Sequence, residues 1–175
     1  MNGVLRITRS NDGGFNNFVR ILRKAMIWKP NVTVAAVVEQ ANRFLLVEEQ
    51  IASEGPTVFN QPAGHLEPGE SLIQAVIRET LEETGYTFAP EWLIGIYHWH
   101  SVDNNTTYLR FAFSGHVTDF DPDYARESVI VSADWYAMPM IESLVKRHRS
   151  PLVMQCIQDF IAGKRFPLEI LTHYN

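Results

Sequence analysis

Apolar and β-branched residues gather in five runs along the chain, and each run has a length typical of a β-strand. The predicted strands cover residues 31–40, 44–50, 92–102, 107–117 and 129–137. Short polar segments separate the first run from the second and the third from the fourth, so we predict that each of these pairs is joined by a turn. Residues 51–58 contain Gly and Pro and are predicted to form a loop.

Between these runs the apolar spacing changes to that of helices. Residues 71–84 are predicted to form a helix with Ser71 as N-cap, Gln74 three residues later in a capping box, and Gly85 as the stop. Residues 139–148 are predicted to form a short helix. Residues 150–163 are predicted to form a longer one, with Ser150 as cap and Pro151 at the first position. Strands alternating with helices predict an α/β fold, a mixed sheet in an α/β/α sandwich.

Composition narrows the class of protein. The chain has 175 residues, 46% of them hydrophobic, which suits one domain with one core. A formal net charge of −5 gives no sign of a nucleic-acid-binding surface. No apolar run reaches the roughly 18 residues of a membrane span, and no secretory signal is evident, so we expect a cytoplasmic protein. The single cysteine, Cys156, excludes an intrachain disulfide and sits in an apolar helical setting typical of a buried structural thiol.

Residues 1–28 differ in character from the rest of the chain. This segment carries five basic side chains against the single acid Asp12. It is compatible with a loosely ordered extension or with a short basic amphipathic helix, and the sequence leaves both open. Residues 29–175 are predicted to form the functional domain.

The predicted helix 71–84 gathers carboxylates on one face. Glu79, Glu82 and Glu83 stand at i, i+3 and i+4, so they share one arc of the helix, where like charges repel. Arg78 flanks this arc and can reach Glu82 one turn later, or Glu70 from the preceding loop. A hard divalent cation would reverse the repulsion, because oxygen ligands suit Mg²⁺ or Mn²⁺. The alternative is a solvated, glutamate-rich helix face.

A longer pattern around this helix favours the metal site. The segment fits G-x5-E-x7-R-E-U-x-E-E-x-G-U, where U is a bulky apolar residue, at Gly64, Glu70, Arg78, Glu79, Glu82, Glu83, Gly85 and Tyr86. This pattern resembles the Nudix box, with Thr80 as a departure that concerns packing rather than catalysis. The resemblance spans about residues 31–163 and implies an enzyme that hydrolyses phosphoanhydride bonds with Mg²⁺.

The resemblance also implies a role for each matched residue. Glu79, Glu82 and Glu83 match positions that bind metal or activate water, without deciding which is the base. Glu70 and Arg78 match a supporting pair, and the Gly64 carbonyl matches a backbone metal ligand.

Segments outside the box, at 29–38, 59–70, 108–113, 149–153 and 165–171, resemble the NudJ phosphatase branch. That branch is implied to release orthophosphate from nucleoside tri- and diphosphates and from the pyrimidine pyrophosphate precursor of thiamine. Two alternatives stay open. One is a pyrophosphatase of nucleotide sugars or dinucleoside polyphosphates. The other is a non-catalytic Nudix-type nucleotide sensor, which would be expected to have eroded box glutamates.

Substrate-side candidates lie outside the helix. Trp99 can stack on a base and Arg110 can pair with a phosphate, although each is equally compatible with a structural role. Phe59 and Gln61 precede the box loop and can line a pocket, although Phe59 is equally compatible with a position in the core. Glu127, in the loop after the fourth strand, is a candidate for an extra base or metal ligand, or a solvated acid. The expected partner is a small phosphoanhydride substrate, and the sequence does not decide between a monomer and a homodimer.

Overall fold

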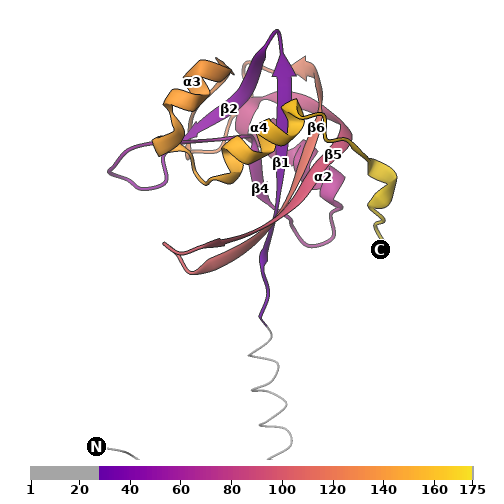
Figure 1. Cartoon of the computed structure of the whole chain (residues 1–175). Helices are drawn as coiled ribbons and strands as arrows, with labels where there is room; N and C mark the ends of the chain where they lie inside the picture. The colour runs from indigo at the N-terminus through magenta and orange to yellow at the C-terminus, as the bar shows by residue number, and fades with distance from the viewer. Residues whose placement is uncertain (1–27, 175) are drawn as a thin grey trace, which may run out of the picture.

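The computed structural model describes residues 28–174 (Figure 1). The interpretations offered for the N-terminal extension therefore lie outside the described residues, apart from Trp28. No helix of the described part is long and apolar enough to cross a membrane.

The described strands form one mixed sheet. They are β1 (Asn31–Gln40), β2 (Arg43–Glu49), β3 (Val58–Asn60), β4 (Ala63–His65), β5 (Tyr86–Ser101), β6 (Thr106–Phe120), β7 (Ile130–Ala137) and β8 (Phe166–Pro167). Six of them follow the order β3-β2-β1-β6-β5-β8, while β4 pairs with β1 and β7 pairs with β2. The β1–β6 pair is parallel and the other strand pairs are antiparallel, which confirms the predicted mixed sheet.

Helix α2 (Leu72–Thr84) follows the sequence prediction closely. Ser71 accepts a hydrogen bond from the backbone of Gln74, and the Gln74 side chain accepts one from the backbone of Ser71, so the predicted capping box is present. Gly85 ends the helix with φ of 76°, a left-handed conformation that favours glycine.

Two further helices follow the sheet in sequence. Helix α3 (Met138–Ser143) is shorter than the predicted 139–148 and gives way to a 3₁₀ turn, η1 (Val145–Arg147). Helix α4 (Leu152–Ile161) begins one residue later than predicted, with Pro151 rather than Ser150 at the cap position. Ser150 still assists, because its hydroxyl accepts a hydrogen bond from the Leu152 N–H at 3.2 Å. A second 3₁₀ turn, η2 (Leu168–Ile170), lies near the C-terminus.

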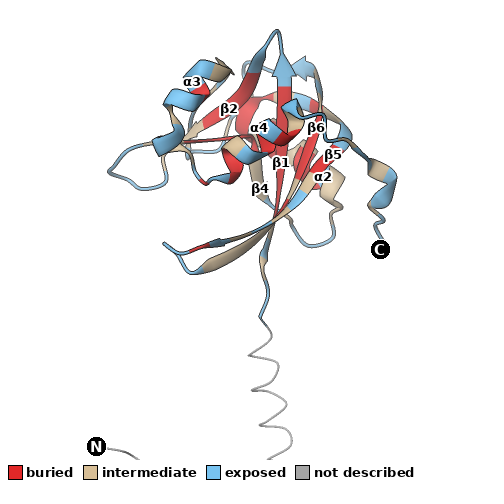
Figure 2. Cartoon of the chain, viewed as in Figure 1, coloured by how far each residue is buried: buried red, intermediate tan, exposed pale blue. Residues whose placement is uncertain are grey.

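The helices cover opposite faces of the sheet. On one face, Ala75 and Val76 of α2 pack in a buried cluster with Val34 and Phe113. On the other, Cys156 and Ile157 of α4 pack in a second cluster that includes Val37. Figure 2 shows the buried residues concentrated where the helices meet the sheet. The α/β/α sandwich is confirmed, and Cys156 is a buried free thiol as expected.

Strand boundaries are where the sequence prediction was wrong. β5 begins at Tyr86 rather than at residue 92, and β6 continues to Phe120 rather than ending at residue 117. The first part of β5 was not predicted because Pro90 and the bulges near it interrupt the alternation of apolar and polar residues. The three-residue strands β3 and β4 were missed because so few residues show no alternation. The β5–β6 hairpin extends beyond the body of the sheet (Figure 1).

Candidate functional site

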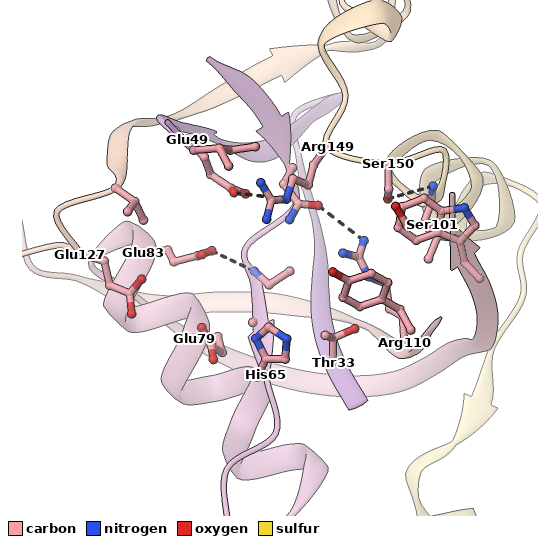
Figure 3. A pocket seen from close by; sticks show the side chains of 18 of the residues that line it. Thr33, Glu49, His65, Glu79, Glu83, Ser101, Arg110, Glu127, Arg149 and Ser150 are labelled. Atoms are coloured by element: carbon pink, nitrogen blue, oxygen red, sulfur yellow. Dashed lines mark hydrogen bonds and ion pairs between the residues drawn. The ribbon is translucent and has the colours of Figure 1, made fainter. Parts of the chain in front are cut away.

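A cavity of about 770 Å³ opens at one end of the sheet (Figure 3). Its lining comes from β4, the C-terminal half of α2, the β5–β6 hairpin, and the segment that enters α4. Figure 3 shows Glu79 and Glu83 on one side of it and Arg110 on the other, and Trp99 and Tyr108 also line it. The cavity thus brings together segments that are far apart in the sequence.

Two of the three box glutamates are buried. Glu79 is 6% exposed and Glu83 is 4% exposed, so the alternative of a solvated helix face is wrong for both. Burial raises the pKa of Glu79, and it raises the pKa of Glu83 well above the ordinary value. Glu82 is only half-buried and lies nearer solvent. Two desolvated carboxylates close together favour a bound positive charge or a shared proton.

The first residues of β4 hold these carboxylates in place. The Ala63 N–H donates to Glu83 Oε2 at 2.8 Å, and Gly64 follows directly. A Cβ atom on Gly64 would overlap with the carboxylate of Glu79, so a side chain at this position would displace that group. Residue 64 is therefore a glycine because there is no space for a side chain, and not because of its backbone conformation.

Arg78 joins the box loop to the helix. Its guanidinium donates to Glu70 at 2.7 and 3.0 Å, to Glu79 at 2.8 Å and to Glu82 at 2.9 Å. It also donates to the His65 carbonyl at 3.0 Å. Both contacts predicted for Arg78, with Glu70 and with Glu82, are present. The hydrogen bond from Arg78 is the largest influence lowering the pKa of Glu70, and Glu70 in turn contributes most to raising the pKa of Arg78.

Thr80 and Glu127 occupy the surroundings of this cluster. Thr80 is fully buried and donates its hydroxyl hydrogen to the Val76 carbonyl at 2.7 Å, so the departure from the box pattern is indeed a packing feature. Glu127 lies in the loop after β6 and lines the cavity, although it is exposed. Its backbone N–H donates to the Glu82 carbonyl at 3.2 Å, which ties this loop to the end of α2.

The donor set suits a hard divalent cation. Glu79, Glu82, Glu83 and Gly64 all line the cavity and offer carboxylate and carbonyl oxygens, which are the ligands that such ions prefer. Among residues 28–174, no three His, Cys, Asp or Glu side chains lie close enough together to hold a metal ion as they stand. In this arrangement Arg78 supplies positive charge to Glu79 and Glu82, whereas Glu83 has only the Ala63 N–H as hydrogen-bond partner in the described structure. The chemistry of the site fits a divalent metal ion.

The substrate-side candidates divide into two groups. Trp99 lines the cavity and stacks on Tyr108, with ring centroids 5.5 Å apart and an interplanar angle of 20°. Arg110 also lines the cavity and is only 7% exposed, so it is no surface residue. The neighbouring His98 and His100 are exposed and do not line the cavity, because alternate residues of β5 point to opposite faces.

Phe59 and Gln61 do not line this cavity, and Phe59 takes the core position that the sequence left open for it. Phe59 packs edge-to-face on Tyr136, with centroids 5.5 Å apart, and under the guanidinium of Arg147 at 4.6 Å. Gln61 is buried and donates to the Val153 carbonyl at 2.7 Å. The residue between them, Asn60, faces the cavity instead. The two-residue alternation at β3 explains this outcome, and a three-residue strand was too short for its phase to be predicted.

Several cavity residues had not been singled out from the sequence. They are Thr33, Glu49, Asn60, Tyr108 and Arg149. Glu49 ends β2, where burial raises its pKa although Arg149 lies 3.9 Å away. In the sequence, only the position of Glu49, a charged residue at the end of an apolar strand, could have indicated a place in the cavity. Only the pairing of distant strands brings these five side chains together.

The sequence comparisons agree with this geometry. The sequence profile of the NUDIX domain matches residues 29–153, which is more than half of the chain and includes the whole box helix. The chain belongs to the Nudix family. Nudix hydrolases generally use divalent metal ions, in agreement with the oxygen donors of this Nudix domain.

Named relatives and solved structures place the chain within the Nudix family. It is 39% identical over 149 residues to a protein of Escherichia coli strain K12 named Phosphatase NudJ, covering 85% of this chain and 95% of that protein. A Phosphatase NudJ of Shigella boydii is also 39% identical, over 151 residues. A solved Nudix hydrolase from Nitrosomonas europaea is 59% identical, with a TM-score of 0.82, covering 83% of this chain and 98% of that one. The chain is thus a Nudix hydrolase, an enzyme.

Proposed function

We propose that this Nudix hydrolase is a Mg²⁺-dependent phosphatase that removes orthophosphate from nucleoside tri- and diphosphates. The pyrophosphorylated pyrimidine precursor of thiamine is a further proposed substrate. The proposed catalytic domain covers residues 29–175. The observation that carries the proposal is the pair of buried carboxylates, Glu79 and Glu83, at a cavity that also contains the buried guanidinium of Arg110. Identity to proteins named Phosphatase NudJ supports the choice of a phosphatase.

The residues of the box have two proposed roles, metal binding and the positioning of the metal ligands. Glu79, Glu82, Glu83 and the Gly64 carbonyl would hold the metal ion, and one of the three glutamates accepts the proton of the attacking water. When bound there, Mg²⁺ would supply positive charge that makes the attacking water more acidic and offsets the negative charge of the phosphoryl group. Glu70 positions Arg78 through two hydrogen bonds, and Arg78 in turn orients Glu79 and Glu82. Glu127 stands at the mouth of the site as an additional base or ligand.

Trp99 and Arg110 are proposed to contact the substrate on the opposite side of the cavity. The indole of Trp99, already stacked on Tyr108, offers an aromatic surface for a base. Arg110 supplies positive charge where a phosphate would lie. With the organic group at Trp99 and the reacting phosphate at the glutamates, the substrate lies along the length of the cavity.

A substrate panel with Mg²⁺ tests this function. Orthophosphate and pyrophosphate release should be measured separately for nucleoside tri- and diphosphates, the pyrimidine pyrophosphate, a nucleotide sugar and a dinucleoside polyphosphate. We expect orthophosphate from both the tri- and the diphosphates. Nucleoside monophosphate from the linked dinucleotides alone would instead identify a pyrophosphatase. Absence of any turnover, with retained nucleotide binding, would favour a sensor.

A further inference from the structure

Arg110 is a buried cation without a counter-ion in the described structure. Across residues 28–174, none of its guanidinium nitrogens lies within 4.0 Å of a carboxylate oxygen. One amino group donates to Asn60 Oδ1 at a long 3.5 Å, and the buried Nε has no hydrogen-bond partner in the described residues. Burying a charged group without a partner is strongly unfavourable, so an anionic ligand is the simplest compensation.

The side chains that act most strongly on the charge of Arg110 do not neutralise it. Cys156 of α4 interacts with the guanidinium, but burial raises the pKa of this thiol to about 11, so it carries no charge at neutral pH. Glu49 and Glu83 act on Arg110 only at longer range, and Glu49 lies 3.9 Å from a nitrogen of Arg149. The guanidinium thus keeps its positive charge available toward the cavity that it lines.

Thr33 stands beside Arg110 with a second unused polar group. The two residues are register partners on the parallel strands β1 and β6, so their side chains leave the sheet on the same face. The Thr33 hydroxyl is buried and has no hydrogen-bond partner in the part of the chain that the structure describes. Both residues line the same cavity, and Figure 3 shows them on one wall of it.

We propose that Thr33 and Arg110 form a subsite for the phosphate adjacent to the one that is attacked. This inference rests on the proposed function. It assigns the attacked phosphate to the side of the glutamates and the adjacent phosphate to the side of Arg110. The carboxylates of α2 repel a phosphate unless a cation intervenes, whereas Arg110 and the Thr33 hydroxyl bind one directly. The ligand class is therefore a diphosphate-bearing compound, which reaches both sides at once, in preference to a monophosphate.

Binding of inorganic phosphate to the metal-free protein tests the subsite. The thermal midpoint would be followed against phosphate concentration in EDTA at constant ionic strength. The variants are Arg110→Met, Thr33→Val, which keeps shape but loses the hydroxyl, and Arg43→Met. Arg43 is exposed and does not line the cavity, so it controls for the loss of one positive charge. We expect phosphate to raise the midpoint of the wild type and of Arg43→Met equally.

The two subsite variants should bind phosphate more weakly. Arg110→Met should need about 10- to 100-fold more phosphate for half of the shift, and Thr33→Val about 2- to 10-fold more. No shift in the wild type, or an undiminished shift in Arg110→Met, would overturn the proposal. Should Arg110→Met fail to fold, Thr33→Val decides alone, and an unchanged titration in that variant would overturn it.

Steady-state kinetics separate this inference from the proposed function. With Mg²⁺ and a nucleoside diphosphate, Arg110→Met should raise KM by about 10- to 100-fold, while Arg43→Met keeps the wild-type KM. An unchanged KM in Arg110→Met would overturn the subsite and leave the hydrolase intact. Conversely, a wild type that hydrolyses no phosphoanhydride would end the proposed function, and the metal-free titration would still decide on the subsite.

Discussion

The carboxylate of Glu83 accepts a hydrogen bond from the backbone N–H of Ala63 at 2.8 Å. This contact links the last turn of α2 to the first residue of β4. It is the one hydrogen bond that the Glu83 side chain makes in the described structure, and it leaves a desolvated carboxylate at the cavity together with that of Glu79. The hydrogen bond between Glu83 and Ala63 shows that the acidic residues of α2 form a buried site only where β4 packs beside the helix.

Glu83→Gln should separate catalysis from stability. Turnover should fall by about 100-fold or more, because the amide neither accepts a proton nor carries the charge that a metal ion requires. The metal-free variant should unfold at a higher temperature than the wild type at pH 8, since an amide oxygen keeps the Ala63 hydrogen bond without burying a charge. Turnover assays and thermal unfolding in EDTA measure the two effects.

The pH dependence of that stability gain has a definite sign. Burial raises the pKa of Glu83 in the folded protein, so the ionised wild-type side chain is penalised at high pH and the penalty fades as pH falls through the folded pKa. The advantage of Glu83→Gln should therefore shrink from pH 8 toward pH 5. A gain that grows with acidity would contradict the assignment, as would near-normal turnover in the variant.

Adding Mg²⁺ should stabilise the wild type but not Glu83→Gln. A ligand that binds only the folded state raises its stability, and the variant lacks one of the proposed oxygen ligands. The thermal midpoint would be recorded with and without millimolar Mg²⁺, using Ca²⁺-free buffer and EDTA as the baseline. Equal shifts in the two proteins would show that Glu83 is not a ligand of the metal ion.

Gly64→Ala should damage the site more than the fold. The new methyl group would overlap with the carboxylate of Glu79 and displace it, and a shift of about 1 Å in a catalytic group costs on the order of 100-fold in turnover. Gly163→Ala is the matched control, because Gly163 has a φ of +79° but open space around it and lies after α4. The control should lose stability while keeping its turnover. Equal turnover in both variants would disprove the steric argument.

Arg78→Lys should weaken the response to metal. Lysine keeps the charge but cannot span Glu70, Glu79 and Glu82 together as the guanidinium does. We expect the Mg²⁺ concentration for half-maximal activity to rise by about 10- to 100-fold, as for other groups that orient metal ligands. Arg43→Lys, at an exposed position that does not line the cavity, controls for the exchange of a guanidinium for an ammonium elsewhere. An unchanged Mg²⁺ requirement in Arg78→Lys would contradict a supporting role.

His148 should make the protein less stable in mild acid. Burial lowers the pKa of this imidazole, whose Nε2–H donates to the Ile141 carbonyl at 3.0 Å. The unfolded chain then binds a proton more readily than the folded one, so stability is retained above about pH 6.5 and falls as pH drops through the folded pKa. His148→Gln should flatten that fall in urea unfolding between pH 7.5 and 5.5. Parallel curves for the two proteins would disprove this.

Local rules were enough to predict α2 and its ends from the sequence. A capping box depends on residues three apart, and a left-handed stop depends on one glycine, so both are present in the structure as predicted. The same local spacing placed Glu79, Glu82 and Glu83 on one arc and Arg78 within reach of Glu70 and Glu82. The Nudix resemblance rests on that segment, and the family assignment agrees with it.

Only the tertiary structure decided which of these side chains lose contact with water. Glu79 and Glu83 are buried because β4 lies against the helix, and β4 is too short to be predicted from its own residues. Strand pairing likewise turned Arg110 and Asn60 toward the cavity and Phe59 into the core. The sequence by itself determined the helix, its caps and the order of its charges, because these depend on neighbours along the chain. Burial and the juxtaposition of Thr33 with Arg110 depend on pairing between residues 77 positions apart, which no local pattern records.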